Sequence, residues 1–247
     1  MNSLRFKRIL LKVGGESLLG KREYGIDPEA ARIVAEQIKQ VYTQHVQVAI
    51  VIGGGNIFRG LAGEKNGIDR ATADYMGMLA TVMNGLALQD ALEKTGVPTR
   101  MQSALLMPAV AESYVRRRAI RHMEKGRVVI LAAGTGVPYV TTDTGASLHG
   151  LELHCDVLMK ATKVDGIYER DPMKDPKAKR YTTLNFSDAI ALPGVEVMDT
   201  AAMAMCQENH MPIMVFELFK PGNLQRAITG EEIGTYVSSD VTTKLER

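Results

Sequence analysis

The 247-residue sequence has few of the features that would place it at once in a class of proteins. It has only two cysteines, Cys155 and Cys206, and their wide separation argues against a zinc site and favours reduced, buried thiols. Its 30 basic and 28 acidic residues leave a net charge of +2, which gives no reason to expect a nucleic-acid or membrane partner. No apolar run approaches the roughly 20 residues of a membrane-spanning helix, and the first residues do not resemble an export signal. We therefore expect a soluble, cytoplasmic protein.

Three common motifs are also missing. No segment reads GxxxxGK[ST], so a P-loop nucleotide site is excluded. The stretch Gly53 to Asn56 does not complete the GxGxxG fingerprint of dinucleotide-binding folds, and the five histidines show no HExxH spacing. There is no internal repeat, low-complexity segment or long linker, so we predict a single domain over residues 1–247.

Short apolar, β-branched runs alternate with helical stretches along the chain. Buried strands are predicted at Ile9–Val13, Val46–Ile52, Val97–Met101, Val128–Ala132, Val157–Met159 and Ile213–Phe216. Helices are predicted at Pro28–Gln44, Asp69–Lys94, Glu112–Lys125, Asp143–Leu153 and Thr200–Glu208. This alternation predicts an α/β protein, a three-layer αβα sandwich with a mainly parallel central sheet. The turn-rich stretch Asp165–Asn185 is predicted to be an irregular loop that could serve as a lid.

Glycines gather at the ends of three predicted strands. They form the clusters Gly14-Gly15, Gly53-Gly54-Gly55 and Gly134-Thr135-Gly136. Ligands of α/β sheets bind at this edge, where glycine lets backbone N–H groups approach a phosphate closely. A single cluster is equally well explained by the preference of turns for glycine. Three clusters together favour one or two polyanionic ligands.

Charged side chains near these glycines favour the same interpretation. Lys12 lies inside an apolar strand, where an ammonium group is costly unless it meets an anion such as a phosphate. The alternative is a lysine whose charged end reaches water at the edge of a strand. Arg59 could hold a second phosphate and Asp74 a sugar or base, although each alone is more often a surface charge. Asp143 ends a polar loop, and its carboxylate could also cap the helix that follows.

Five segments together resemble the bacterial uridylate kinases of the amino acid kinase superfamily. They are Lys12 to Glu16, Val51 to Asn56, Asp74 to Met78, Ala133 to Asp143 and Lys160 to Gly166. The resemblance covers nearly the whole chain and implies an amino acid kinase fold. It also implies transfer of a phosphoryl group from ATP to UMP, giving UDP and ADP in pyrimidine nucleotide biosynthesis. The UMP-binding part would lie mainly in residues 1–150, and the ATP-binding part mainly in residues 151–247 together with the Lys12 loop.

The resemblance also assigns roles to individual residues. Lys12, Asp143 and Arg59 would be catalytic, with Asp143 organising either Lys12 or a magnesium ion between the two nucleotides. The residues implied to bind ATP are Lys12, Val13, Gly14, Gly15, Gly55, Arg59, Thr162, Tyr168 and Asp171. Those implied to bind UMP are Gly54, Asp74, Thr135, Gly136, Val137, Pro138, Tyr139, Val140, Thr141 and Thr142. Family members often carry serine in place of Gly14 and asparagine in place of Val137, so one hydroxyl and one amide contact are lost here.

Mg²⁺ accompanying ATP is the expected cofactor, with no metal site of the protein's own. The resemblance further implies a homohexamer that GTP activates and UTP inhibits. The basic run from Arg116 to Arg127 could serve as an effector site, a subunit interface, an RNA-binding surface or simply a solvated helix face. Two other functions stay open. One is a kinase that acts on a carboxylate or carbamate, and the other is a nucleotide sensor that binds UMP without catalysis.

Overall fold

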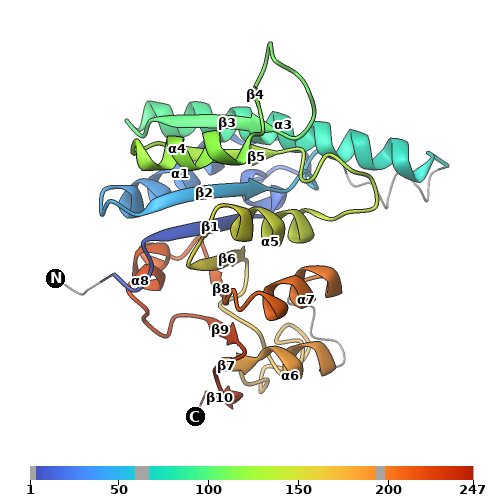
Figure 1. Cartoon of the computed structure of the whole chain (residues 1–247). Helices are drawn as coiled ribbons and strands as arrows, with labels where there is room; N and C mark the ends of the chain where they lie inside the picture. The colour runs from blue at the N-terminus through green and yellow to red at the C-terminus, as the bar shows by residue number, and fades with distance from the viewer. Residues whose placement is uncertain (1–3, 59–66, 193–197, 247) are drawn as a thin grey trace.

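One ten-stranded sheet runs through the described part of the molecule (Figure 1). The computed structural model describes residues 4–58, 67–192 and 198–246. The strands are Arg8–Val13 (β1), Gln47–Ile52 (β2), Thr99–Ser103 (β3), Glu112–Ser113 (β4), Val128–Ala132 (β5), Val157–Thr162 (β6), Tyr181–Asn185 (β7), Ile213–Glu217 (β8), Thr235–Ser238 (β9) and Lys244–Leu245 (β10). Their order is β10-β7-β9-β8-β6-β1-β2-β5-β3-β4, and only the β8–β9 and β10–β7 pairs are antiparallel. The six predicted strands form the parallel centre, β8-β6-β1-β2-β5-β3, which confirms that prediction.

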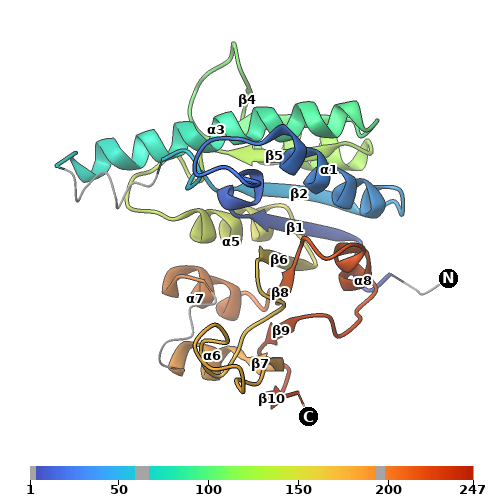
Figure 2. The same cartoon turned by 180° about the vertical axis from the view of Figure 1, so that it is seen from behind.

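Helices cover both faces of this sheet. They are Gly15–Leu18 (η1, a 3₁₀ helix), Pro28–Tyr42 (α1), Arg70–Lys94 (α3), Arg116–Glu124 (α4), Thr142–Glu152 (α5), Phe186–Ala191 (α6), Thr200–Glu208 (α7) and Asn223–Ile228 (α8). Helices α4, α5, α6 and α7 lie in front of the sheet in Figure 1, whereas α1, α3 and α8 lie behind it and face the viewer in Figure 2. The predicted three-layer αβα sandwich is therefore confirmed. No helix in these three ranges is long and apolar enough to cross a membrane.

Two apolar cores separate the layers, and β1 shows how the sequence divides between them. Its side chains alternate in direction, so Ile9, Leu11 and Val13 enter the core beneath α1 and α3. Leu10 enters the opposite core, beneath α4, α5 and α7. Lys12 is two residues from Leu10 and therefore points to the α5 side of the sheet, where the strand ends and the apolar core stops.

Local signals set the ends of several helices. The Asp27 side chain accepts a hydrogen bond from the Glu29 N–H at 3.0 Å, and Pro28 occupies the first turn of α1. Asp199 caps α7 in the same way through the Ala202 N–H at 2.9 Å. These caps explain why the predicted starts of both helices are correct.

Tertiary contacts overrule the sequence pattern at other places. The predicted helix Glu112–Lys125 begins only at Arg116, because residues 112 and 113 pair with β3 as strand β4 and the Glu112 carboxylate accepts a hydrogen bond from Gln102 at 3.2 Å. The predicted strand Val97–Met101 is shifted to Thr99–Ser103. The loop predicted over Asp165–Asn185 ends in strand β7, and Tyr168 pairs with Arg180 within it.

Candidate active site

Two of the glycine clusters meet at the carboxyl ends of β1 and β2. A Cβ atom added to Gly15 would lie 2.3 Å from Asn56 Oδ1 and 2.9 Å from both the carbonyl oxygen of Gly53 and the nitrogen of Gly55. Only glycine fits this approach of one backbone to another. The Asn56 amide is itself fixed, because it exchanges hydrogen bonds of 2.7 and 3.0 Å with the buried Asn84 of α3. The loops after β1 and β2 are therefore packed rigidly against each other beside Lys12.

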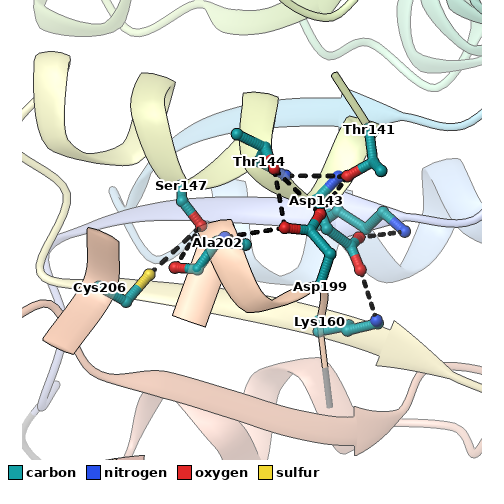
Figure 3. Close-up of polar contacts among 9 residues, drawn as sticks. Thr141, Asp143, Thr144, Ser147, Lys160, Asp199, Ala202 and Cys206 are labelled. Atoms are coloured by element: carbon teal, nitrogen blue, oxygen red, sulfur yellow. Dashed lines mark hydrogen bonds and ion pairs between the residues drawn. The ribbon is translucent and has the colours of Figure 1, made fainter. Parts of the chain in front are cut away.

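Two lysines on neighbouring strands share one carboxylate. Lys12 of β1 and Lys160 of β6 are partners in the parallel register, so their side chains leave the sheet on the same face. Asp143, in the first turn of α5, lies between them (Figure 3): its Oδ1 is 2.7 Å from Lys12 Nζ and its Oδ2 is 2.8 Å from Lys160 Nζ. The three side chains are only 12–16% exposed. Two ammonium groups are therefore held at fixed positions at the end of the sheet.

The charge state of Asp143 follows from this arrangement. Burial by itself would raise the pKa of the carboxyl group, but the ammonium groups of Lys12 and Lys160 outweigh it and hold the pKa of Asp143 below its usual value. The group is thus an anion at neutral pH, and the cluster carries one net positive charge. A site of this kind is suited to an additional anion such as a phosphate.

The free energy of unfolding is expected to depend on pH through Asp143. Because its pKa is lower in the folded chain than in the unfolded one, where it is about 3.9, the carboxylate stabilises the fold at pH values above about 5. That stabilisation is lost as the pH falls through the folded-state pKa. Urea unfolding of wild type and Asp143→Asn between pH 7 and pH 3 should show a stability difference that shrinks toward acid. A difference that is constant over this range would contradict the assignment.

The start of α5 is tied to the start of α7. Thr141 caps α5, since its hydroxyl accepts hydrogen bonds from the N–H groups of Asp143 and Thr144 at 3.1 and 3.2 Å. The cap is therefore Thr141 and not Asp143, whose carboxylate is committed to the lysines. Asp199 accepts hydrogen bonds from the hydroxyls of Thr141 and Thr144, the second at 2.9 Å (Figure 3). This clamp fixes the helix that carries Asp143.

Two adjacent cavities flank the cluster. The larger, of about 520 Å³, is lined by Lys12, Thr141, Thr142, Asp143, Lys160, Ala189, Ile190, Met198, Asp199, Thr200 and Met203. The smaller, of about 210 Å³, is lined by Gly54, Gly55, Phe58, Asp74, Gly77, Met78, Thr81, Ala133, Gly134, Thr135, Val140 and Thr142. Thr142 lines both, so the two cavities meet beside Asp143. Molecules bound in the two would meet beside Thr142 and Asp143, with both lysines in the wall of the larger cavity.

Asp74 organises the wall of the smaller cavity. Its Oδ2 accepts hydrogen bonds from Arg70 Nε at 2.9 Å and from the backbone N–H of Tyr139 at 2.8 Å. The Arg70 guanidinium lies 5.4 Å from the centre of the Tyr139 ring. Asp74 thus ties helix α3 to the loop that precedes α5, in addition to any contact with a ligand.

Nine of the twenty predicted site residues line one or both of these cavities: Lys12, Gly54, Gly55, Asp74, Thr135, Val140, Thr141, Thr142 and Asp143. Val13 is buried in the core. The predicted residues that line neither cavity also include Gly14, Gly15, Gly136, Val137, Pro138, Tyr139, Thr162, Tyr168 and Asp171. The Thr162 hydroxyl donates to the Val164 carbonyl at 2.6 Å, and the Tyr168 hydroxyl donates to Asp165 at 2.6 Å. Arg59, predicted to be catalytic, lies outside the described residues.

Sequence reasoning missed two charged residues of the larger cavity, Lys160 and Asp199. Lys160 lies in an apolar strand in the same way as Lys12, and that signal was available in the sequence. Asp199 gave only a helix-cap signal, because its contacts with Thr141 and Thr144 depend on the packing of α5 against α7. Within the described ranges, no group of three or more histidine, cysteine, aspartate or glutamate side chains could hold a metal ion.

The basic run is only partly a free surface. Arg116 Nε donates to the Glu152 carbonyl oxygen at 2.5 Å, and Arg127 NH1 lies 3.0 Å from His122 Nδ1. Arg117, Arg118 and Lys125 are exposed on α4. Arg116 and Arg127 therefore support the packing of α4. Arg117, Arg118 and Lys125 form a small basic face.

Comparisons with known proteins agree with this architecture. The model of the amino acid kinase family matches residues 7–217. Among solved structures, a UMP kinase from Bacillus anthracis is 36% identical with a TM-score of 0.94, and the match covers 98% of this chain and 99% of that one. A UMP kinase from Ureaplasma parvum is 36% identical with a TM-score of 0.89, covering 95% and 100%. A uridylate kinase from Archaeoglobus fulgidus is 28% identical with a TM-score of 0.72, covering 93% and 99%. The chain belongs to the amino acid kinase family.

Proposed function

We propose that the chain is a kinase that transfers the γ-phosphoryl group of ATP to UMP, giving ADP and UDP in pyrimidine nucleotide biosynthesis. The observation that carries this proposal is the pair of cavities that meet at Thr142, beside two lysines held by one buried carboxylate. The identity of 36% to two UMP kinases over almost the whole chain supports UMP as the acceptor.

The geometry suits a reaction that needs alignment and charge neutralisation more than covalent chemistry. An oxygen of the UMP phosphate attacks the γ-phosphorus of ATP, and the bond to the bridging oxygen of ADP breaks. Because the UMP phosphate is already anionic, no general base is assigned. Asp143 holds Lys12 and Lys160 in the wall of the larger cavity, beside the point where the two cavities meet, so their ammonium groups can stabilise charge on the transferred group.

The two nucleotides are assigned to the two cavities. UMP would occupy the smaller one, against Gly54, Asp74 and the loop of residues 135–142, in the part of the chain formed mainly by residues 1–150. ATP would occupy the larger one, with its phosphates near Gly14 and Gly15 and its adenosine toward residues 151–247. Thr162, Tyr168 and Asp171 would reach the adenosine from the edge of that cavity.

Mg²⁺ would come with ATP. Asp143 is committed to two lysines, and Asp199 accepts hydrogen bonds from two threonine hydroxyls and one backbone N–H. Neither carboxylate is available as a strong metal ligand by itself. The ion would therefore be held mainly by phosphate oxygens, where it would neutralise charge on ATP.

The expected assembly is a cytoplasmic homohexamer that GTP activates and UTP inhibits, without a membrane or nucleic-acid partner. An exposed apolar stripe on α3 supports contact between subunits; it consists of Tyr75, Met76, Leu79, Met83 and Leu86. The basic face of α4 is the proposed place for an anionic effector, and it serves equally well as a subunit interface.

A coupled assay of ADP release with ATP and Mg²⁺ tests the function. The acceptors compared are UMP, CMP, dUMP, N-acetylglutamate and aspartate. Turnover mainly with UMP is expected, because the smaller cavity offers glycine backbone and Asp74 and not a cationic site for a small acid. Turnover only with an amino acid would instead show that the chain is a kinase that phosphorylates a carboxylate. Binding of UMP without turnover would favour the alternative function, a nucleotide sensor that binds UMP without catalysis.

A further inference from the structure

The wall of the smaller cavity contains a strained turn directly after β5. Ala133 and Gly134 both adopt left-handed backbone conformations, with φ angles of 64° and 53°. This region is unfavourable for alanine and persists only when the surroundings fix it. Both residues line the cavity assigned to UMP. The shape of this cavity therefore depends on whatever holds the turn.

Two side chains from different helices hold it. The hydroxyl of Thr81, in α3, accepts a hydrogen bond from the Ala133 N–H at 2.7 Å. From the other side of the sheet, Nε2 of His149 in α5 lies 3.1 Å from the carbonyl oxygen of Gly134. The backbone closes the turn with a hydrogen bond from the Gly136 N–H to the Ala133 carbonyl at 2.9 Å. His149 is the side chain that bonds the Gly134 carbonyl.

The ring of His149 has an acceptor at each nitrogen. Its Nδ1 lies 3.1 Å from Glu152 Oε2, and the side chain is only 5% exposed. Glu152 is held in turn by the Tyr114 hydroxyl at 2.5 Å, and the Tyr114 ring packs edge-on against His149 with centres 4.6 Å apart. Burial and the neighbouring carboxylate raise the pKa of Tyr114 far above its usual range, so its hydroxyl remains a donor.

We propose that His149 is a positioning residue for the acceptor nucleotide: its ring, anchored by Glu152 and Tyr114, bonds the Gly134 carbonyl and holds the left-handed turn that shapes the smaller cavity. This inference rests on the proposed function only in naming UMP as the occupant.

The groups that anchor the ring come from three elements. Glu152 lies one turn further along α5, Tyr114 follows β4, and Arg116 of α4 donates to the Glu152 backbone carbonyl. Without the ring, the Gly134 carbonyl loses this hydrogen-bond partner. The KM for UMP should then rise while the KM for ATP does not.

Steady-state kinetics of His149→Gln, Tyr114→Phe and wild type, with each substrate varied in turn, test this. Glutamine can donate to one acceptor but lacks the ring that packs against Tyr114. We expect the KM for UMP to rise about tenfold in His149→Gln and less in Tyr114→Phe, with kcat and the KM for ATP changed less than about twofold. His45→Gln, at an exposed histidine before β2, is the matched control and should behave as wild type.

Amide hydrogen exchange of residues 133–136 gives an independent answer. Faster exchange of these residues in His149→Gln than in wild type supports the inference. Unchanged exchange, an unchanged KM for UMP, or equal rises in both KM values would overturn it. If wild type does not phosphorylate UMP, the proposed function fails, whereas the amide exchange of residues 133–136 in His149→Gln still decides the role of His149.

Discussion

The Lys12→Ala variant is expected to phosphorylate UMP about a thousandfold more slowly than wild type, as measured by kcat in the coupled assay. Lys12 Nζ lies 2.7 Å from Asp143 Oδ1 in the wall of the larger cavity, where charge would develop on the transferred phosphoryl group. Lys160 cannot replace it, because Lys160 leaves the neighbouring strand and is bound to the other carboxylate oxygen. Removal of Lys12 also takes one of two cations from the partly buried Asp143.

Lys94→Ala provides the control for this variant. The Lys94 side chain is 74% exposed and pairs with Asp90 on the surface of α3, an interaction of little energetic weight. Its activity should match that of wild type. Near-normal kcat in a folded Lys12→Ala protein would contradict a role in catalysis, whereas a rise confined to the KM for ATP would reduce Lys12 to a binding residue.

The Gly15→Ala variant is expected to lose about 3 kcal/mol of unfolding free energy in urea titrations, and most of its activity. The new methyl group would meet the Gly53 carbonyl oxygen and the Gly55 nitrogen at 2.9 Å, and the buried Asn56 amide at 2.3 Å. Backbone atoms cannot rotate away, so the loops after β1 and β2 must separate. This displacement would move the glycine backbone that is proposed to contact the ATP phosphates.

Gly14→Ala is the matched comparison, one residue earlier in the same loop. Gly14 has an extended backbone, with φ −66° and ψ 147°, which alanine adopts freely. Its added Cβ would meet only the carboxylate end of Glu16, an exposed side chain that can turn aside. We expect a change in unfolding free energy below about 1 kcal/mol. Equal destabilisation by the two substitutions would show that the crowding at Gly15 is relieved elsewhere.

The parts of the fold that were predicted well are those with local signals. Strand β5 and helix α7 have the predicted bounds, because an apolar β-branched run specifies the first and the Asp199 cap begins the second. Strand β4 could not be predicted, since its two residues pair with β3 only after the chain has folded. Helices α6 and α8 have six residues each, too few for a periodic pattern. Strand β10 depends on pairing with the distant β7.

The candidate site shows the same division. Lys12 and the glycine clusters could be found because a charge in an apolar strand and glycines at strand ends are local anomalies. The sequence left open whether Asp143 contacts Lys12 or a magnesium ion. Its contact with Lys12 depends on the register of β1 and β6 and on the position of α5. Asp199 contacts Thr144, 55 positions away in the sequence, and His149 contacts Gly134, 15 positions away. No local sequence pattern predicts either contact.

The continuous sheet beneath both cavities sets a limit on how the molecule can respond to its ligands. Five parallel hydrogen-bonded pairs join β8 to β3 without interruption, and the pair of β1 with β6 carries Lys12 and Lys160 to the larger cavity. One hydrogen-bond network therefore joins the strands beneath both cavities. A nucleotide bound in either cavity would protect the whole sheet against unfolding by mass action. Adjustment between open and closed states is left to the helices and loops above the strand ends.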